Sequence, residues 1–280
     1  MKTFTDKVAA ITGAGSGIGQ ALAIALAKQG CNLALSDVSE TGLANTVALL
    51  QAFPVKVTTQ KVDVATRDEI AAWAKTVVEQ HGKVNLIFNN AGVALGSTAE
   101  GVSYEDLEWL IGINFWGVVY GTKEFLPYLK QSADGHIINI SSMFGLTAQP
   151  TQSAYNASKF AVRGFTESLR QELDIENSGV SATCIHPGGI RTNIAKAARM
   201  NNSVTSLGMD PVKSQDAFDK LLRTPADEAA NLILNAVQKN RRRLLIGADA
   251  KAVDAIQRLF PQGYQKLFAT ATALQARFMK

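Results

Sequence analysis

Cysteine and long apolar runs are both scarce in this sequence. Cys31 and Cys184 are the two cysteines among its 280 residues. Both lie in apolar segments and lack the spacing of metal ligands, so we expect buried, reduced thiols in a reducing compartment and no bound metal. No stretch approaches the length of a membrane span, and the apolar residues before Thr12 are too few for a secretory signal. We therefore expect a cytoplasmic protein made without a leader and without a membrane partner.

A strong excess of charge of one sign is missing as well. The chain has 28 Lys and Arg residues against 24 Asp and Glu residues, for a formal net charge of +4. The basic residues are scattered except for the run at 241–243, which a solvated turn before a strand explains better than a phosphate or nucleic-acid patch. With 46% hydrophobic and 19% charged residues, the composition indicates a soluble globular protein with a sizeable core and no nucleic-acid partner.

Internal repeats, low-complexity tracts and linkers are absent too, and apolar runs alternate with amphipathic segments instead. Runs typical of strands span 8–12, 32–36, 55–62, 85–88, 136–140, 180–185 and 244–246. Segments with helical periodicity span 21–28, 42–53, 67–81, 103–129 (as one or two helices), 154–176 and 225–238. This alternation predicts a single α/β unit, in which a parallel sheet of seven strands has helices on both faces.

Two segments depart from the alternation. Residues 190–223 mix apolar residues with asparagines and serines, which favours a mobile lid or an insertion. Residues 248–280 follow the last strand and predict two amphipathic helices separated by Pro261. We expect this C-terminal extension to pack on the main domain, residues 1–247, or at a subunit interface. A membrane-surface or partner-binding helix is the alternative.

A glycine-rich turn separates the first predicted strand from the first predicted helix. Gly13, Gly17 and Gly19 form the pattern T-G-x-x-x-G-x-G, in which glycine permits a tight turn and lets a pyrophosphate approach the helix N-terminus. Asp37 ends the second strand, where a carboxylate accepts hydrogen bonds from adenosine ribose hydroxyls and repels a 2′-phosphate. Since no arginine follows at Val38, NAD is favoured over NADP. A structural loop and an Asp37 that merely caps the next helix are the alternatives.

A serine, a tyrosine and a lysine lie close together in the sequence near the predicted helix 154–176. Tyr155 and Lys159 are four residues apart, so both side chains share one helix face. A neighbouring ammonium favours the phenolate and lowers the pKa of the tyrosine, as a base near neutral pH requires. Ser142 adds a hydroxyl to the same site. An ordinary amphipathic helix with a solvated lysine is the alternative.

Taken together, motifs along residues 6–247 resemble the classical short-chain dehydrogenase/reductase family. They occur in the family's order: Thr12-Gly13-Ala-Gly-Ser-Gly17-Ile-Gly19, Asp63-Val64, Asn89-Asn90-Ala91-Gly92, Asn114, Ser142, Tyr155-Asn-Ala-Ser-Lys159 and Pro187-Gly188. The resemblance implies a single Rossmann-like, doubly wound sheet in a dinucleotide-binding catalytic domain, residues 1–247, followed by the helical extension 248–280. It also implies a homodimer or homotetramer that pairs the helices at 103–129 and 154–176.

The resemblance further implies which residues form the site. The catalytic tetrad matches Asn114, Ser142, Tyr155 and Lys159. Cofactor-binding positions match Gly13, Ser16, Gly17, Ile18, Gly19, Asp37, Asp63, Val64, Asn90, Ala91, Gly92, Tyr155, Lys159, Pro187, Gly188, Ile190 and Thr192. Among these, Asp63 and Val64 would flank the adenine, Asn90 would line the cofactor cleft, and Ile190 and Thr192 would hold the nicotinamide carboxamide.

The tetrad residues would divide the chemistry between them. Tyr155 would act as general base or acid, Ser142 would bind the substrate oxygen, and Lys159 would also hold the nicotinamide ribose. Asn114 would hold a water that passes protons to solvent, or else would merely fix a helix kink.

Three loops should line the substrate pocket, at 93–97, at 143–152 and after Gly189. Their apolar side chains, Val93, Leu95, Met143, Phe144 and Leu146, favour an uncharged, lipophilic secondary alcohol or ketone. Arg191 is an exception that faces substrate, cofactor or solvent. The expected activity is that of an NAD-dependent short-chain alcohol dehydrogenase or ketone reductase. The alternatives are a non-catalytic dinucleotide sensor or scaffold, and a sugar-nucleotide epimerase or dehydratase.

Overall fold

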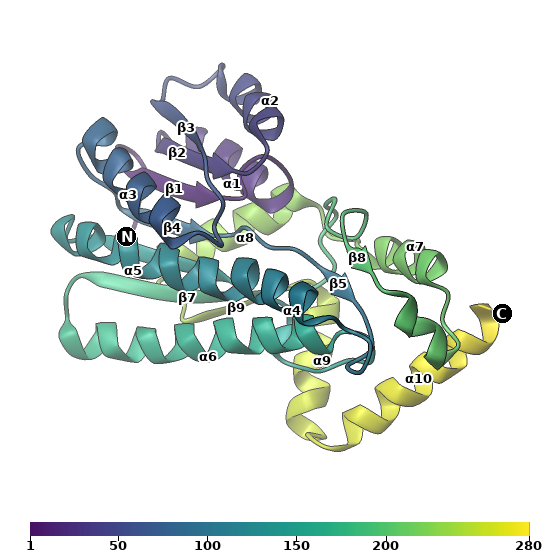
Figure 1. Ribbon diagram of the computed structural model, residues 1–280. Coiled ribbons are helices and arrows are strands. Elements are labelled where there is room, and N and C mark those ends of the chain that lie inside the picture. Colours follow the sequence, from purple (N-terminus) through teal and green to yellow (C-terminus); the bar gives the residue numbers. More distant parts are fainter. Residues whose placement is uncertain (280) are drawn as a thin grey trace.

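The computed structural model describes residues 1–279, and its centre is the predicted parallel sheet (Figure 1). Seven strands lie in the order β3-β2-β1-β4-β6-β7-β9, and each neighbouring pair is parallel. The strands are β1 Val8–Thr12, β2 Asn32–Asp37, β3 Val57–Lys61, β4 Leu86–Asn89, β6 Gly135–Ile140, β7 Val180–Pro187 and β9 Arg243–Ile246. The Rossmann-like, doubly wound sheet is confirmed. Because β1 lies between β2 and β4, the direction of winding reverses there, and such a reversal opens a crevice at the carboxyl ends of both strands.

Helices cover both faces of the sheet. They are α1 Gly17–Ala27, α2 Glu40–Leu50, α3 Arg67–His81, α4 Tyr104–Ile111, α5 Gly117–Gln131, α6 Ser153–Glu176, α7 Pro211–Leu221, α8 Ala226–Gln238, α9 Ala248–Leu259 and α10 Gly263–Met279. Along β1, Ala9 and Ile11 pack with α1, α2 and α8, whereas Val8 and Ala10 pack with α3, α5 and α6. Because side chains alternate along a strand, a strand that is apolar throughout supplies both layers.

The predicted helical stretch 103–129 is two α-helices joined by one π-helical turn. Ser103 caps α4 by accepting a hydrogen bond from the Asp106 amide at 3.1 Å. The turn η1, Gly112–Trp116, then leads into α5. Single π-helical turns mark functional positions in many helices, and the turn here contains Asn114.

The segment 190–223 is tied to the main domain. The short strand β8, Arg199–Met200, pairs with β5, Leu95–Gly96, in a separate two-stranded sheet. The Arg199 guanidinium lies 2.7 Å from Asp106 and 3.6 Å from the ring centroid of Trp109. The segment also contains the 3₁₀ turn η3, Asn202–Leu207, before α7. These contacts hold it as a wall over the carboxyl ends of the strands.

The extension after β9 forms the two predicted helices. In Figure 1, α10 runs beyond the layered body, at the end of the molecule where β5 and α7 also lie. Asp254 of α9 forms an ion pair with Arg243 of β9. The Tyr264 hydroxyl of α10 accepts a hydrogen bond from the Ala148 amide at 3.3 Å. None of the helices within residues 1–279 is long and apolar enough to cross a membrane. The division of the chain at residue 247 stays a prediction.

Candidate active site

A cleft of about 420 Å³ opens at the carboxyl ends of β1, β2, β4, β6 and β7. With one exception, every residue predicted to bind the cofactor lines it. The exception is Gly19, which is buried in α1 beneath the glycine turn. Ser142, Tyr155 and Lys159 also line the cleft, whereas Asn114 lies behind its wall. The topology therefore brings together residues that are more than 170 positions apart in the sequence.

The glycine turn is packed too tightly to admit a larger residue at two of its glycines. Gly13 has a φ of +64°, and a Cβ atom there would lie 2.8 Å from Ala91 Cα. A Cβ atom on Gly19 would lie 2.2 Å from the Gly13 carbonyl oxygen. Ser16 precedes α1 without capping it through its side chain. The first amides of α1 therefore remain suited to an anion, so the turn fits a dinucleotide pyrophosphate.

The Asp37 carboxylate has a defined place next to this turn. Its Oδ2 accepts a hydrogen bond from the Gly15 amide and its Oδ1 one from the Ser39 amide, both at 2.9 Å. The helix α2 is capped by Ser39, whose hydroxyl accepts from the Gly42 amide. Asp37 is therefore not the cap of the next helix, and its carboxylate lines the cleft where an adenosine ribose would lie.

The side chain of Asn90 forms hydrogen bonds with the glycine turn. Its Nδ2 donates to the carbonyl oxygens of Thr12 at 2.9 Å and Gly13 at 3.2 Å. The Thr12 hydroxyl in turn accepts from the Asn90 and Ala91 amides, both at 3.0 Å. These bonds join the ends of β1 and β4, and so hold the two sides of the crevice at a fixed separation.

Ser142, Tyr155 and Lys159 form a compact buried group in the same cleft, beyond the glycine turn. Their exposed fractions are 8%, 9% and 4%. The Lys159 ammonium donates to the Ile140 carbonyl at 3.1 Å and lies 5.6 Å from the centroid of the Tyr155 ring. The Ser142 Oγ accepts from the Phe144 amide at 3.1 Å, which leaves the hydroxyl hydrogen available for an oxygen in the cleft.

Burial decides the acidity of this pair in the protein chain itself. It raises the pKa of Tyr155 to about 12, partly opposed by the hydrogen bond with Ser142. It also lowers the pKa of Lys159 to about 8. The predicted lowering of the tyrosine pKa is therefore wrong for the chain alone, because removing the phenolate from water costs more than the hydrogen bond with Ser142 returns. Lys159 keeps most of its charge at pH 7.

Asn114 acts on the backbone beside the cleft. Its Oδ1 accepts from the Val93 amide at 2.8 Å, and its Nδ2 donates to the Val93 carbonyl at 3.0 Å. The same Nδ2 lies 3.3 Å from the Ser158 hydroxyl. The side chain thus joins the π-helical turn to the loop after β4 and to α6. Its role with a water stays a prediction.

The end of the cleft beyond the tetrad is mostly apolar. It is lined by Val93, Ala94, Met143, Phe144, Gln149, Asn193, Ile194, Ala197, Phe218, Leu221 and Leu222. Of the predicted pocket residues, Leu95 and Leu146 belong to the core instead, with exposed fractions of 2% and 1%. Phe218 and the two leucines belong to α7 and its end. The segment after Gly189 was predicted to line the pocket, but the helix within it and these residues were not.

Asp249 is a cleft residue that the sequence analysis missed. It lies in the first turn of α9, and its Oδ2 accepts from the Gly189 amide at 2.7 Å. A Cβ atom on Gly188 would lie 2.2 Å from Asp249 Oδ1, so the carboxylate packs directly on this turn. The carboxyl ends of parallel strands share one edge of the sheet, so an acidic residue soon after β9 was a usable signal for it.

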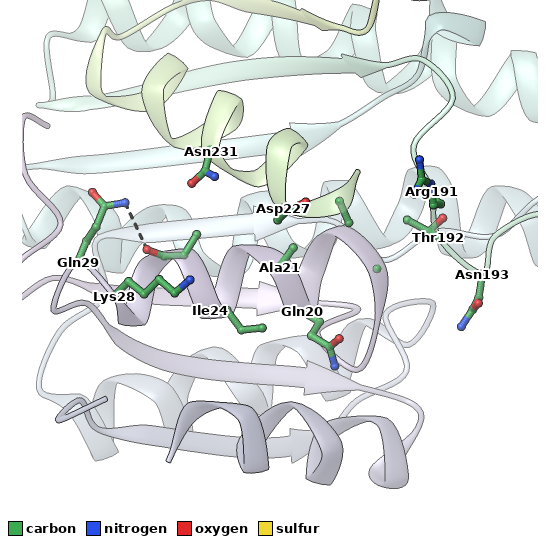
Figure 2. Close-up of a pocket in the computed structure, with 13 residues that line it drawn as sticks. Gln20, Ala21, Ile24, Lys28, Gln29, Arg191, Thr192, Asn193, Asp227 and Asn231 are labelled. Carbon is green, nitrogen blue, oxygen red and sulfur yellow. Dashed lines mark hydrogen bonds between the residues drawn. The ribbon is translucent and has the colours of Figure 1, made fainter. Parts of the chain in front are cut away.

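A second hollow of about 640 Å³ lies between α1 and α8 (Figure 2). It meets the cleft at Gly17 and Thr192, which line both. Arg191 lines this hollow and donates to the Arg223 carbonyl at 3.0 Å, so it faces away from the cleft. None of the tetrad residues lies in this hollow.

The cysteines take no part in the cleft. Cys31 and Cys184 are free and buried, and burial raises the pKa of each thiol to about 12. Such thiols are inert because the thiolate is the reactive form. Within residues 1–279, no group of three or more His, Cys, Asp or Glu side chains is placed to hold a metal ion.

Comparisons with known proteins agree with this geometry. The family model described as short chain dehydrogenase matches residues 7–203. The chain therefore belongs to the short-chain dehydrogenase/reductase family. It is an oxidoreductase that acts on a small molecule with a dinucleotide cofactor.

Three relatives illustrate the similarity. A Mycobacterium tuberculosis protein that carries the name oxidoreductase SadH is 48% identical over 274 residues, 98% of each chain. Estradiol 17-beta-dehydrogenase 11 of Homo sapiens is 30% identical over 266 residues, 94% of this chain and 82% of that protein. A short-chain dehydrogenase/reductase from Burkholderia phymatum, solved in complex with NAD, superimposes with a TM-score of 0.87 at 31% identity, covering 95% of this chain and 97% of that chain.

Proposed function

We propose that the protein interconverts an uncharged, lipophilic secondary alcohol and its ketone, with NAD as the hydride carrier. The proposal rests on the set of residues that line one cleft. A glycine turn with Asp37 forms one end, buried Ser142, Tyr155 and Lys159 form the middle, and apolar side chains form the other end.

The proposed cofactor contacts follow from the groups that line the cleft. The amides at the start of α1 would hold the pyrophosphate, and Asp37 would accept hydrogen bonds from the adenosine ribose. The Asp37 carboxylate also argues for NAD over NADP, because it would repel a 2′-phosphate. The relative from Burkholderia phymatum was solved with NAD, which supports the same choice.

The proposed chemistry is proton transfer by Tyr155 next to a hydride acceptor. Bound NAD supplies the carbon that accepts hydride and a positive charge on the ring. Tyr155 takes the hydroxyl proton of the alcohol, or returns one to the ketone oxygen in the reverse direction. Since burial raises the pKa of its phenol to about 12, proton removal requires the positive charges of Lys159 and of the cofactor nearby.

Ser142 and Lys159 complete the proposed site. The Ser142 hydroxyl donates to the substrate oxygen and stabilises the negative charge that develops there; removal of such a donor costs about 10²- to 10³-fold in rate. Lys159 is held by the Ile140 carbonyl, and from there its ammonium can hydrogen-bond the nicotinamide ribose. Asn114 keeps the Val93 loop against the cleft.

The substrate class is inferred from the apolar wall. Met143, Phe144, Phe218 and Leu222 all line the cleft, and no Lys or Arg other than Lys159 lines it among the described residues. A carboxylate or phosphate group on the substrate would therefore lie without a cationic partner. The name of the relative estradiol 17-beta-dehydrogenase 11 describes an apolar secondary alcohol, which supports the same class.

We also propose a homodimer or homotetramer through α4, α5 and α6. Trp116 lies in the π-helical turn just before α5, and Phe160 lies in α6. Their exposed fractions are 46% and 39%, which supports an apolar contact there. Size-exclusion chromatography with light scattering tests this. A monomer at micromolar concentration would contradict it. The cytoplasmic location remains a prediction.

The decisive experiment is a substrate screen of the purified protein. Secondary alcohols of increasing apolar size are offered with NAD and, in parallel, with NADP, and NADH formation is followed by absorbance. We expect turnover with NAD that improves with apolar size and falls for carboxylated analogues. If NADH binds, as measured by its fluorescence, but no alcohol or ketone is turned over, the protein is a dinucleotide sensor and the enzymatic proposal fails.

A further inference from the structure

His186 lies directly behind the catalytic group, at the end of β7 and one residue before Pro187. It is fully buried, and its Nδ1 lies 2.9 Å from the carbonyl oxygen of Ser142. A carbonyl oxygen accepts hydrogen bonds and cannot donate one, so Nδ1 must carry the hydrogen. The contact therefore fixes the imidazole tautomer, with the lone pair on Nε2.

The other ring nitrogen shows that packing alone does not explain this histidine. His186 Nε2 is buried without a hydrogen-bond partner among the described residues. A buried polar atom without a partner lowers the stability of the fold. An apolar side chain of the same size would avoid that cost. What the imidazole adds at this position is the donor on Nδ1.

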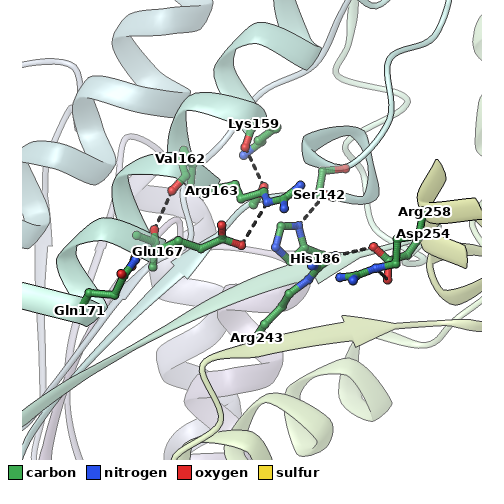
Figure 3. A network of polar contacts seen from close by, with 12 residues as sticks. Ser142, Lys159, Val162, Arg163, Glu167, Gln171, His186, Arg243, Asp254 and Arg258 are labelled. Carbon is green, nitrogen blue, oxygen red and sulfur yellow. Dashed lines mark hydrogen bonds and ion pairs between the residues drawn. The ribbon is translucent and has the colours of Figure 1, made fainter. Parts of the chain in front are cut away.

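Charged side chains from three elements surround the ring (Figure 3). Arg163 and Glu167 of α6 form an ion pair at 3.0 Å, and Arg243 of β9 pairs with Asp254 of α9. Arg258 of α9 shares Asp254, at 2.9 Å. Burial, with Arg243 and Arg163 nearby, lowers the pKa of His186 to about 4. The ring is therefore neutral near pH 7, and the tautomer set by Ser142 is the one present.

The contact acts on the segment that presents the Ser142 hydroxyl. Ser142 has an extended backbone, with φ −164° and ψ 167°, at the point where β6 turns into the 3₁₀ turn η2, Met143–Gly145. Its carbonyl also accepts from the Gly145 amide at 2.9 Å. Among the contacts of residues 1–279, His186 provides the side-chain donor to this carbonyl.

We propose that His186 is a positioning residue, which holds the Ser142 backbone so that the Ser142 hydroxyl points at the substrate oxygen beside Tyr155. The inference rests on the proposed function, because His186 acts through Ser142. A displacement of about 1 Å at a reacting group can cost about 10²-fold in rate. A side chain that fixes the backbone of the donor thus contributes to turnover without touching the substrate.

The test compares two substitutions of equal size. His186→Asn keeps an N–H donor near the place of Nδ1, whereas His186→Leu has the same shape as asparagine and no donor. We expect His186→Leu to lower kcat about 10- to 100-fold, while KM for NAD and the NADH dissociation constant stay within about twofold of wild type. His186→Asn should recover most of kcat. Equal kcat values for the two variants would overturn the proposal.

A third variant covers the case in which His186→Leu does not fold. His186→Gln carries the same amide as asparagine one carbon further out, beyond the reach of the Ser142 carbonyl, so its kcat should fall where that of His186→Asn does not.

In a Ser142→Ala background, His186→Leu should cause less than a twofold further loss of kcat, because the two residues act as one unit. A full additional loss would show that His186 acts elsewhere.

The tautomer is measured independently of activity. The ¹⁵N shifts of the His186 ring in the wild-type protein should report a hydrogen on Nδ1 and a bare Nε2 at pH 7. A hydrogen on Nε2 would overturn the proposal even if turnover is normal. If wild-type turnover is absent while the Nδ1–H tautomer is observed, the proposed function fails and the contact that holds Ser142 stands.

Discussion

The two ends of the cleft are built in different ways. At the cofactor end, the side chains of Asp37 and Asn90 form hydrogen bonds with backbone groups of the glycine turn, Gly13 among them, and each motif is complete within a few residues of a strand end. At the reaction end, Tyr155 and Lys159 are ionisable side chains that burial holds far from their ordinary pKa values. The cofactor end is a polar cradle, whereas the reaction end buries a neutral phenol and a charged ammonium whose ionisation burial disfavours.

The largest expected effect is a loss of turnover that leaves cofactor binding intact, which distinguishes the reaction end of the cleft from the cofactor end. Tyr155→Phe removes the proton-transfer group and leaves the apolar ring, so we expect kcat to fall about 10³-fold or more. The glycine turn and Asp37 are untouched, so the NADH dissociation constant should stay within about twofold of wild type. Turnover near the wild-type rate in this variant would exclude Tyr155 as the acid and base. Stopped-flow absorbance and NADH fluorescence provide the two measurements.

The matching change at the cofactor end is Asp37→Ala. Loss of the carboxylate removes the proposed charged acceptor of the ribose hydroxyls, worth about 1.5–3 kcal/mol in total, so KM for NAD should rise about 10- to 100-fold. The ratio of kcat/KM for NADP to that for NAD should also increase. The control is Ser39→Ala, which keeps the backbone amide that donates to Asp37 but removes the hydroxyl that caps α2, and should lower stability by about 1 kcal/mol without changing KM.

A smaller effect is expected at the apolar wall. Phe218→Ala removes a partly buried side chain of α7 that lines the cleft, so KM for an apolar alcohol should rise about 10-fold, at the lower limit of the about 1.5–3 kcal/mol for full burial of a large apolar side chain. KM for NAD should not change. Val212 lies on the same helix, is 67% exposed and does not line the cleft, so Val212→Ala is the matched control. Equal effects of both variants would show that α7 acts through stability alone.

The smallest expected effect is on stability and measures the strain at the reaction end. The pKa of Lys159 falls from its ordinary 10.5 to about 8 in the folded chain, so the unfolded chain binds the proton more tightly. The contribution of Lys159 to the free energy of unfolding should therefore rise between about pH 8 and 10.5, and at pH 7 the buried charge costs up to about 3 kcal/mol. The two buried thiols oppose this rise above about pH 9, so the contribution is measured as a difference between wild type and a Lys159 variant.

Lys159→Met should remove this cost. The Ile140 carbonyl loses its donor in the variant, which offsets part of the gain, so we expect the variant to be about 1–3 kcal/mol more stable at pH 7. The difference from wild type should shrink towards pH 10. Urea unfolding of the chain without cofactor at both pH values measures this. A variant that is less stable at pH 7 and at pH 10 alike would show that Lys159 is not under strain.

Short-range patterns allowed much of the fold and of the cofactor end to be predicted. The alternation of apolar runs and amphipathic segments predicted the seven strands, because a strand buried on both faces must be apolar throughout. The family motifs placed Gly13, Asn90 and Ser142 at strand ends, where the crevice lies. The prediction was less complete where distant segments meet: Leu95 and Leu146 proved to be core residues, and the roles of Phe218 and Asp249 were not foreseen.

The sequence by itself determined the order of the strands along the chain, the glycine turn and the identity of the tetrad candidates, because each depends on residues within one turn or one strand. The tertiary structure decided which side chains form the apolar wall. It also brought Asp249 of α9 against the Gly188-Gly189 turn and His186 against the Ser142 carbonyl. It also decided the acidity of Tyr155, since burial depends on the packing of the whole domain and raises the phenol pKa, whereas the spacing from Lys159 predicted that the pKa is lowered.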